Sequence, residues 1–203
     1  MRWIGGGSGA GKSTFAKRLV NAQGATLYDT DRMMGEHTAR CSAERCPNLA
    51  VFTDMSMDER WVRRTPVAML DSFHWFEGEG FDLIVEDLLS MPRDVPVIVE
   101  GFRLLPRLVA PLLADRRNAL WLLPTPAFRQ HAFDRRGTTW DIPRRTSDPE
   151  RALANLLERD ALFTERLRIE ASKFDLRSLE VDGALPGDAL TDIIEKQFFQ
   201  QNR

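Results

Sequence analysis

The stretch IGGGSGAGKST, residues 4–14, indicates the fold class of this 203-residue chain. It contains the spacing Gly-x4-Gly-Lys-Ser, formed by Gly6, Gly11, Lys12 and Ser13, which is typical of a loop that wraps around phosphate groups. An apolar run precedes the loop and an amphipathic helix pattern follows it, as this motif requires. Glycines let the backbone curl so that successive N–H groups point toward an anion. The pattern therefore predicts a phosphate-binding loop between a strand and a helix.

Each part of this loop has an expected partner on a nucleotide. Lys12 is expected to reach the β- and γ-phosphates, Ser13 to ligate Mg²⁺, and Thr14 to donate to the α-phosphate. The full set expected to hold the phosphates is Gly6, Gly7, Ser8, Gly9, Ala10, Gly11, Lys12, Ser13 and Thr14. The alternative is a glycine-rich turn with an incidental lysine, which the flanking strand and helix patterns disfavour.

Composition excludes several classes of protein. Lys and Arg number 28 against 30 Asp and Glu, which gives a formal net charge of −2 and argues against a nucleic-acid polymer as partner. No run approaches the roughly 20 apolar residues that span a bilayer, so no membrane partner is expected. We expect one cytoplasmic domain over residues 1–203, whose oligomeric state cannot be read from sequence.

Five short apolar runs predict strands that alternate with helical patterns. The predicted strands are Arg2–Gly5, Ala25–Asp29, Val95–Glu100, Ala119–Pro124 and Ser178–Val181. This alternation predicts an α/β fold, a three-layer sandwich in which helices cover both faces of a parallel sheet.

Helix starts are marked by capping patterns. Ser and Glu at i and i+3 predict capping boxes, and Thr-Pro pairs predict an N-cap followed by a first helical residue. The boxes are Ser56 with Glu59 and Ser147 with Glu150, and the pairs are Thr65-Pro66 and Thr125-Pro126. We expect two or three helices over residues 57–89 and a final helix from about Gly187 to Phe199.

Three acids stand at the carboxyl ends of predicted strands, where open parallel sheets bind ligands. Glu100 ends an apolar strand, at the position from which an acid holds Mg²⁺ through water or aligns a nucleophile. Asp29 and Asp31, at i and i+2 of an extended segment, point the same way. One of the pair would help to hold Mg²⁺ while the other accepts the proton of an incoming hydroxyl. The alternative for Asp29 and Asp31 is a solvated pair near a helix cap.

His37, Cys41 and Cys46 raise the question of a zinc site. Their H-x3-C-x4-C spacing supplies three ligands and matches no known zinc motif. We therefore expect two free, buried cysteines, in keeping with a reducing compartment.

Together, the loop, the segment LYDTD at residues 27–31, the strand VIVEG at residues 97–101 and a later arginine-rich segment resemble the P-loop nucleoside- and nucleotide-kinase-like phosphotransferases. This group includes shikimate kinase, gluconate kinase, nucleoside monophosphate kinases and chloramphenicol phosphotransferase. The resemblance implies a five-stranded parallel sheet in the order 2-3-1-4-5. It also implies that Asp29 positions Mg²⁺ and that Asp31 touches the hydroxyl of the substrate.

ATP and Mg²⁺ are the cofactors that the resemblance implies. No Asn-Lys-x-Asp pattern that would read guanine is present, whereas EVDGALPGD, residues 180–188, resembles the loop by which such kinases hold adenine. Asp182 and Gly183 are its candidate nucleotide contacts; the alternative is a plain turn. The expected metal set is Ser13, Asp29 and Glu100, partly through water.

An arginine-rich segment at residues 135–149 is expected to form a lid. A lid arginine that closes over the γ-phosphate would stabilise the charge of the transition state. Arg135 and Arg136 are preferred among the candidates Arg129, Arg135, Arg136, Arg144, Arg145 and Arg159. An exposed connector is the alternative.

Residues 33–89 are expected to bind the acceptor. Aromatic residues with arginines there are suited to enclose a ring and its anionic groups, although helical spacing equally fits a core. The candidate substrate contacts are Asp31, Arg63, Arg64, Arg103 and Arg159.

The sequence thus predicts an ATP-dependent kinase that transfers the γ-phosphate to a hydroxyl or phosphate of a small molecule. One alternative is a nucleoside or nucleotide kinase, which would share these parts. Another is a regulatory nucleotide hydrolase that has no small-molecule acceptor.

Overall fold

The computed structural model of the protein describes residues 1–136, 142–184 and 187–199. Five strands form one parallel sheet in the order β2-β3-β1-β4-β5. Their bounds are β1 Arg2–Gly6, β2 Thr26–Asp29, β3 Val97–Glu100, β4 Ala119–Pro124 and β5 Arg177–Val181. Every predicted strand is present, with ends that differ from the prediction by two residues at most. The order confirms the predicted topology.

The central strands are buried on both faces, which explains why they read as continuous apolar runs. Side chains alternate between two cores: Trp3, Val97 and Val99 belong to one cluster, and Ile4 and Ile98 belong to the other. A strand with period 2 must supply both cores at once, so nearly every residue in it is apolar.

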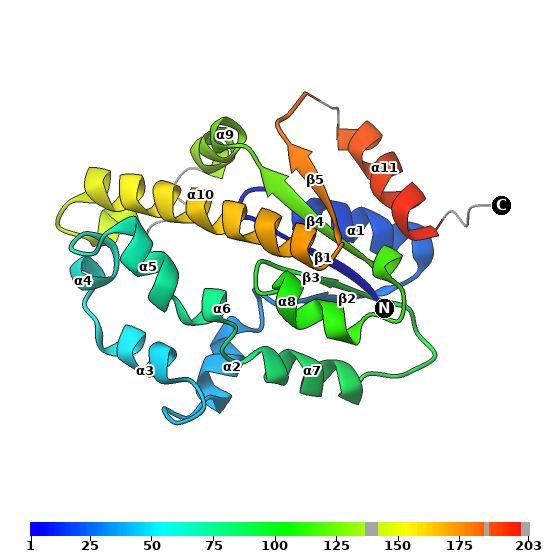
Figure 1. The fold of residues 1–203 in the computed structure, drawn as a ribbon, viewed down its shortest axis with the longest axis horizontal. Coiled ribbons are helices and arrows are strands. Elements are labelled where there is room, and N and C mark those ends of the chain that lie inside the picture. Colours follow the sequence, from blue (N-terminus) through cyan, green and yellow to red (C-terminus); the bar gives the residue numbers. More distant parts are fainter. Residues whose placement is uncertain (137–141, 185–186, 200–203) are drawn as a thin grey trace.

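Helices close both cores and make the fold three-layered (Figure 1). Helices α1 (Lys12–Gln23) and α11 (Gly187–Phe199) cover one face of the sheet. Helices α7 (Phe81–Ser90), α8 (Pro106–Val109) and α10 (Pro149–Lys173) cover the other. None of the helices in the described ranges is long and apolar enough to cross a membrane.

A helical region between β2 and β3 extends beyond the sheet. It contains α2 Met34–Arg40, α3 Pro47–Asp54, α4 Met57–Trp61, α5 Pro66–Ser72 and α6 His74–Glu77 before α7. Four helices therefore lie within residues 57–90, where two or three were predicted. The extra break follows from the extended backbone of Phe73, with ψ of 108°, and from the positive φ of Gly78 and Gly80. The remaining elements are α9 Pro126–Arg136 and the 3₁₀ turns η1 Ala110–Leu112, η2 Arg116–Asn118 and η4 Pro143–Arg145.

The capping patterns predicted most helix starts correctly. The Ser56–Glu59 capping box is formed, and helices begin at Pro66 and Pro126 after their threonine caps. The box predicted at Ser147 is wrong. Ser147 instead donates to both oxygens of Asp58, and Asp148 caps α10 by accepting the N–H of Arg151. Ser147 is therefore engaged in a tertiary contact with Asp58 and does not cap the helix, although its spacing to Glu150 had predicted a cap.

The two cysteines are paired, which corrects the expectation of free thiols. Cys41 and Cys46 form a disulfide across the connection between α2 and α3, with their Cα atoms 5.8 Å apart. Cys46 packs with Leu49 and Trp75 in a small cluster against which Cys41 also packs. The two cysteines are five residues apart, and the turn that brings them together cannot be predicted from this spacing.

Candidate active site

The phosphate-loop sequence lies between β1 and α1. Gly11 is the N-cap of α1 and has φ of 81°, a left-handed conformation that favours glycine. The Lys12 side chain is buried and curls back across the loop, where its Nζ donates to the Gly7 carbonyl at 3.0 Å. The loop therefore presents the N-terminal end of a 12-residue helix, and an ammonium group lies across it.

Asp29 and Asp31 follow β2 and have different surroundings. Asp29 Oδ1 accepts the N–H groups of Asp31 and Arg32 at 3.0 and 3.1 Å, which fixes the turn after the strand. Asp31 Oδ1 accepts from the Thr30 hydroxyl at 3.2 Å and from the Phe102 N–H at 3.3 Å. Burial is the main cause that raises the pKa of Asp31, and the Lys12 ammonium partly offsets it. Asp29 thus positions Asp31, whose carboxylate lies near Lys12.

Glu100 is the last residue of β3 and is fully buried. It pairs in register with Ile4 of β1 and Asp29 of β2, so the strand ends bring it next to the loop and the two aspartates. Neither of its carboxyl oxygens has a hydrogen-bond partner among the described residues. Burial raises the pKa of Glu100 to about 7, although the neighbouring Ser13 hydroxyl and the Lys12 ammonium lower it.

The oxygen ligands at the strand ends suit a hard cation whose coordination shell is completed by water or phosphate oxygens. The described residues contain no cluster of three or more His, Cys, Asp or Glu side chains able to hold a metal ion by themselves. A hydroxyl from Ser13 and an unpartnered buried carboxylate from Glu100 suit Mg²⁺, which takes oxygen ligands and keeps several waters. Asp29 contributes less directly, because one of its oxygens accepts two backbone N–H groups.

Two neighbouring cavities meet at the loop. The smaller, of about 120 Å³, is lined by Ser8, Gly9, Gly11, Lys12, Ser13, Thr14, Asp31 and Phe102. The larger, of about 470 Å³, lies under the helical region between β2 and β3. Ser8 and Phe102 line both cavities. A molecule in the larger cavity would therefore lie beside the phosphate loop and Asp31.

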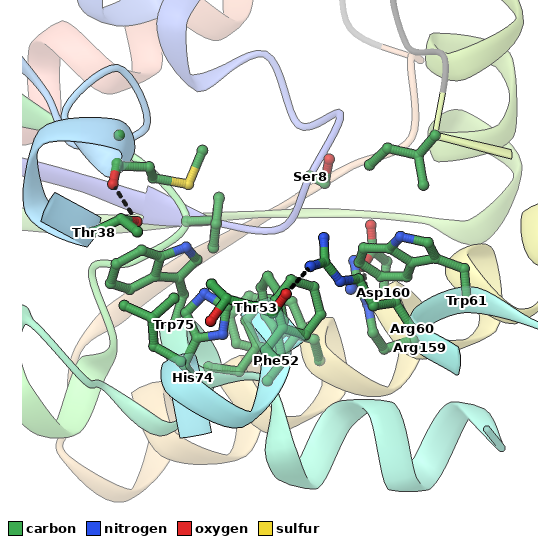
Figure 2. Close-up of a pocket in the computed structure, with 18 residues that line it drawn as sticks. Ser8, Thr38, Phe52, Thr53, Arg60, Trp61, His74, Trp75, Arg159 and Asp160 are labelled. Carbon is green, nitrogen blue, oxygen red and sulfur yellow. Dashed lines mark hydrogen bonds and ion pairs between the residues drawn. The ribbon is translucent and has the colours of Figure 1, made fainter. Parts of the chain in front are cut away.

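Aromatic side chains dominate the larger cavity (Figure 2). The aromatic residues that line it are Phe52, Trp61, Phe73, His74, Trp75, Phe76, Phe102 and Phe163. In Figure 2, His74 and Trp75 lie on one side and Trp61 on the other, while Ser8 faces the rings from the phosphate loop. Burial and three surrounding arginines lower the pKa of His74 to about 3, so its ring is neutral at physiological pH.

Arg159 and Asp160 form a buried pair on α10. The Arg159 Nε and Nη2 atoms donate to Asp160 Oδ1 at 3.0 and 2.6 Å. The Arg159 guanidinium also lies 4.9 to 5.2 Å from the ring centroids of Trp61, Phe73 and Phe76. Both residues line the larger cavity, as does Arg60 of α4.

The predicted substrate contacts divide into two groups. Asp31 and Arg159 line the cavities, whereas Arg63 is exposed and Arg64 turns toward the carbonyl of Ala68 and the hydroxyl of Ser72. The structure does not bring Arg63 or Arg64 to either cavity. Arg60, which the sequence reasoning did not select, lies there instead.

Arg103 is buried behind the site. Its guanidinium donates to the carbonyls of Thr30 and Gly80 and to His37 Nδ1, and it lies 4.0 Å from the ring centroid of Trp75. Burial lowers the pKa of Arg103 to about 10, which still leaves it charged at neutral pH. It joins three chain segments and lines neither cavity.

The predicted lid lies partly outside the described residues. Arg135, Arg144 and Arg145 are exposed, and the side chain of Arg136 and residues 137–141 fall outside the description. Another lid candidate, Arg129 of α9, is buried next to the phosphate loop. Its Nε donates to the Ser8 carbonyl at 3.4 Å, and its Nη2 donates to the Thr164 hydroxyl.

Asp182 and Gly183, the predicted adenine contacts, follow β5 in an exposed turn. Asp182 Oδ1 accepts the N–H of Ala184 at 2.8 Å, and Gly183 has φ of 84°. Both lie at the carboxyl end of the sheet, the same edge as the phosphate loop.

Of three comparisons with known proteins, the comparison with solved structures finds matches. No protein-family model matches the chain, and no curated protein sequence matches it. Among solved structures, a gluconokinase from Sinorhizobium meliloti 1021 is similar over 97% of this chain and 87% of its own, with 18% identity and a TM-score of 0.47. The fold itself is given by the topology of the chain, a five-stranded parallel sheet in the order 2-3-1-4-5 with helices on both faces. At this level of similarity the gluconokinase carries no argument about the substrate.

Proposed function

We propose that this protein is an ATP-dependent kinase that phosphorylates a hydroxyl of a small molecule. The observation that carries the proposal is the shared wall of the two cavities, formed by Ser8 and Phe102. A ligand-sized space thus lies beside the predicted phosphate loop. Asp31 lines the smaller cavity and accepts from the N–H of Phe102, a residue that lines both. Pockets of a few hundred cubic ångströms are the size that small ligands occupy.

In this proposal the transfer is an in-line displacement. The acceptor oxygen forms a bond to the γ-phosphorus while the bond from that phosphorus to the β–γ bridging oxygen breaks. The proton of the acceptor hydroxyl passes to Asp31, whose raised pKa makes it a better proton acceptor. Lys12 and the loop N–H groups stabilise the charge on the departing phosphate.

The metal and the arginines complete the proposed site. Ser13, Glu100 and, through water, Asp29 would hold Mg²⁺, which neutralises charge on the β- and γ-phosphates when bound. Asp182 and Gly183 would contact adenine. The guanidinium that faces the transferred group would come from Arg129 or Arg159, which lie near the loop, or from Arg135 or Arg136 in a closed state.

A large cavity beside the loop favours a kinase over a regulatory hydrolase, because hydrolysis needs room only for water. The regulatory alternative would be favoured by steady ADP release without an acceptor, at a rate raised by a protein partner. A nucleoside kinase is a specific form of this proposal, in which the acceptor is a nucleoside.

An acceptor screen with γ-labelled ATP and Mg²⁺ tests the transfer step. We expect label to move from ATP to at least one hydroxyl compound, and Lys12→Ala to abolish the transfer while circular dichroism shows an intact fold. Label that appears only as inorganic phosphate, at the same rate with and without every acceptor, would contradict the proposal.

A further inference from the structure

The chemistry of the larger cavity narrows the class of acceptor. Its wall consists mainly of ring faces and edges, and several of these rings pack against one another. Phe76 stacks on Phe163 with centroids 3.6 Å apart, and Phe73 contacts Phe52 and Phe76 edge to face. A wall that is already packed in this way keeps its shape when a ligand enters. Such a cavity favours a flat, apolar body.

The polar groups of the cavity are mainly donors. The Arg159 guanidinium is about nine-tenths buried, and its Nη1 has no hydrogen-bond partner among the described residues. The Arg60 Nε likewise has none in the described part of the chain, while its Nη2 donates to the Thr53 carbonyl at 2.8 Å. The dashed line between Arg60 and Thr53 in Figure 2 marks this last bond. Both nitrogens are covered by protein atoms in this structure, so a ligand oxygen would accept from them after a rotation of the guanidinium group. Such a bond would be stabilising, because an unsatisfied buried N–H group is costly.

The charges of the residues that line the larger cavity also favour a ligand with an anionic group. Arg60 and Arg159 carry positive charge, and Asp160 is the one carboxylate among the described lining residues. Because Asp160 already accepts two hydrogen bonds from Arg159, the cavity retains about one uncompensated positive charge. The neutral ring of His74 adds none.

We infer that the acceptor is an aromatic alcohol that carries one anionic group. Its ring would lie among the aromatic side chains, its anionic group would accept from Arg60 and Arg159, and its hydroxyl would reach Asp31 past Ser8 and Phe102. This inference rests on the proposed function, since only a kinase needs the hydroxyl beside the phosphate loop.

Two other acceptor classes fit less well. A polyhydroxylated acid would place several hydroxyls against ring faces, and each buried hydroxyl left unpaired is unfavourable. A nucleoside would need groups that both donate to and accept from the polar edge of its base. Among the described lining residues there is no Asn or Gln, and the hydroxyls that can do both are those of Ser8, Thr38 and Thr53. The hydroxyls of Thr38 and Thr53 already donate to backbone carbonyls.

The test is calorimetric titration of the full-length protein, without ATP, with four named probes. The probes are 4-(hydroxymethyl)benzoate, benzyl alcohol, gluconate and thymidine. We expect 4-(hydroxymethyl)benzoate to bind about tenfold or more tightly than each of the other probes. It alone combines an aromatic ring with a charged hydrogen-bond acceptor, its carboxylate. Equal or tighter binding of gluconate or thymidine, or no binding of any probe, would overturn the inference.

Variants separate the charge contact from general packing. Arg60→Met should weaken 4-(hydroxymethyl)benzoate about tenfold and leave benzyl alcohol nearly unchanged, as the charged contact is removed. Arg168→Met is the control for the loss of an arginine, because Arg168 pairs with Glu165 of α10 and Glu180 of β5 and lies outside the cavity. An equal effect of Arg60→Met on both probes, or no effect on either, would overturn the assigned contact and assign Arg60 to another role.

The two proposals can fail separately. Mg·ATP binding and phosphate transfer, measured on the same preparation, test the kinase function. Transfer to gluconate or thymidine in preference to the aromatic alcohol would support the kinase function and refute the proposed class of acceptor. Selective binding of 4-(hydroxymethyl)benzoate without any binding of ATP would support a site for aromatic anions and refute the kinase function.

Discussion

At the scale of single residues, the site depends on how Asp31 is held. Asp29 fixes the backbone on one side through two N–H groups, and Phe102 donates from the other. Asp31 lines the cavity of the phosphate loop together with Lys12 and Ser13. These contacts orient one carboxylate without surrounding it with cations, as a proton acceptor requires.

Replacing that carboxylate tests its role as the base. Asp31→Asn keeps the shape and the hydrogen-bond acceptor but removes the basic oxygen, so Mg·ATP affinity should persist. We expect the rate of transfer to fall by about 10²–10⁴, the range typical of general base catalysis. Single-turnover kinetics with γ-labelled ATP measures the effect, and an unchanged rate would remove Asp31 as the base.

Gly101 is a second residue whose identity matters. Its φ is 146°, and a Cβ added there would overlap the Thr30 hydroxyl and lie 2.7 Å from Asp31 Oδ1. Gly101→Ala should therefore lower the free energy of unfolding by about 1–3 kcal/mol and slow transfer by displacing Asp31. Gly35→Ala is the control for stability, because a Cβ there meets nothing within 4 Å. Equal denaturation midpoints for both variants would contradict the assigned strain.

At the scale of elements, a buried polar network ties β2, α2 and α7 together behind the site. Arginine can only donate, so the bond from Arg103 makes His37 Nδ1 an acceptor and leaves the proton on Nε2, which donates to Asp87 at 2.8 Å. Tyr28 and Arg40 also donate to Asp87, at 2.5 and 2.6 Å. The network holds Thr30, the residue next to Asp31, through Arg103.

Removing the arginine should therefore weaken the fold and not only the site. Arg103→Met leaves the carbonyls of Thr30 and Gly80 and the His37 ring without their donor. We expect urea denaturation to show a loss of about 3 kcal/mol or more, at about 1–3 kcal/mol for each buried acceptor left unpaired. A loss below about 1 kcal/mol, the lower bound for a single unpaired group, would show that these bonds contribute little to the fold.

The buried histidines predict a characteristic dependence of stability on pH. The folded state keeps His74 neutral down to about pH 3, whereas the unfolded chain protonates near pH 6.5. This contribution is therefore fully present above pH 6.5 and is lost as pH falls below it, by about 1.4 kcal/mol per pH unit. Asp31 and Glu100 act with the opposite sign, because their folded pKa values are raised.

The difference in unfolding free energy between the wild type and His74→Gln, measured as a function of pH, isolates the contribution of the histidine. Glutamine does not titrate, so the wild type should lose stability relative to the variant between pH 6.5 and about 3. Urea denaturation at several pH values measures this. Parallel stability curves for the two proteins would contradict a neutral, buried His74.

At the scale of the whole molecule, the sequence predicted the sheet well and the lining of the larger cavity only in part. Strands buried on both faces and a loop of fixed spacing are local patterns, so their places follow from the residues themselves. The cavity depends instead on how short helices meet. Arg60 lines it because α4 ends at Trp61, and the chain then leaves the helical path before Arg63.

The binding of Mg·ATP tests the proposed function most directly. Calorimetric titration of the wild type should give saturable binding and a matching rise in melting temperature, both dependent on Mg²⁺. Lys12→Ala should weaken binding about tenfold or more, because a charged contact to the phosphates is lost. A titration with neither heat nor thermal shift, at millimolar Mg·ATP, would contradict the proposed kinase.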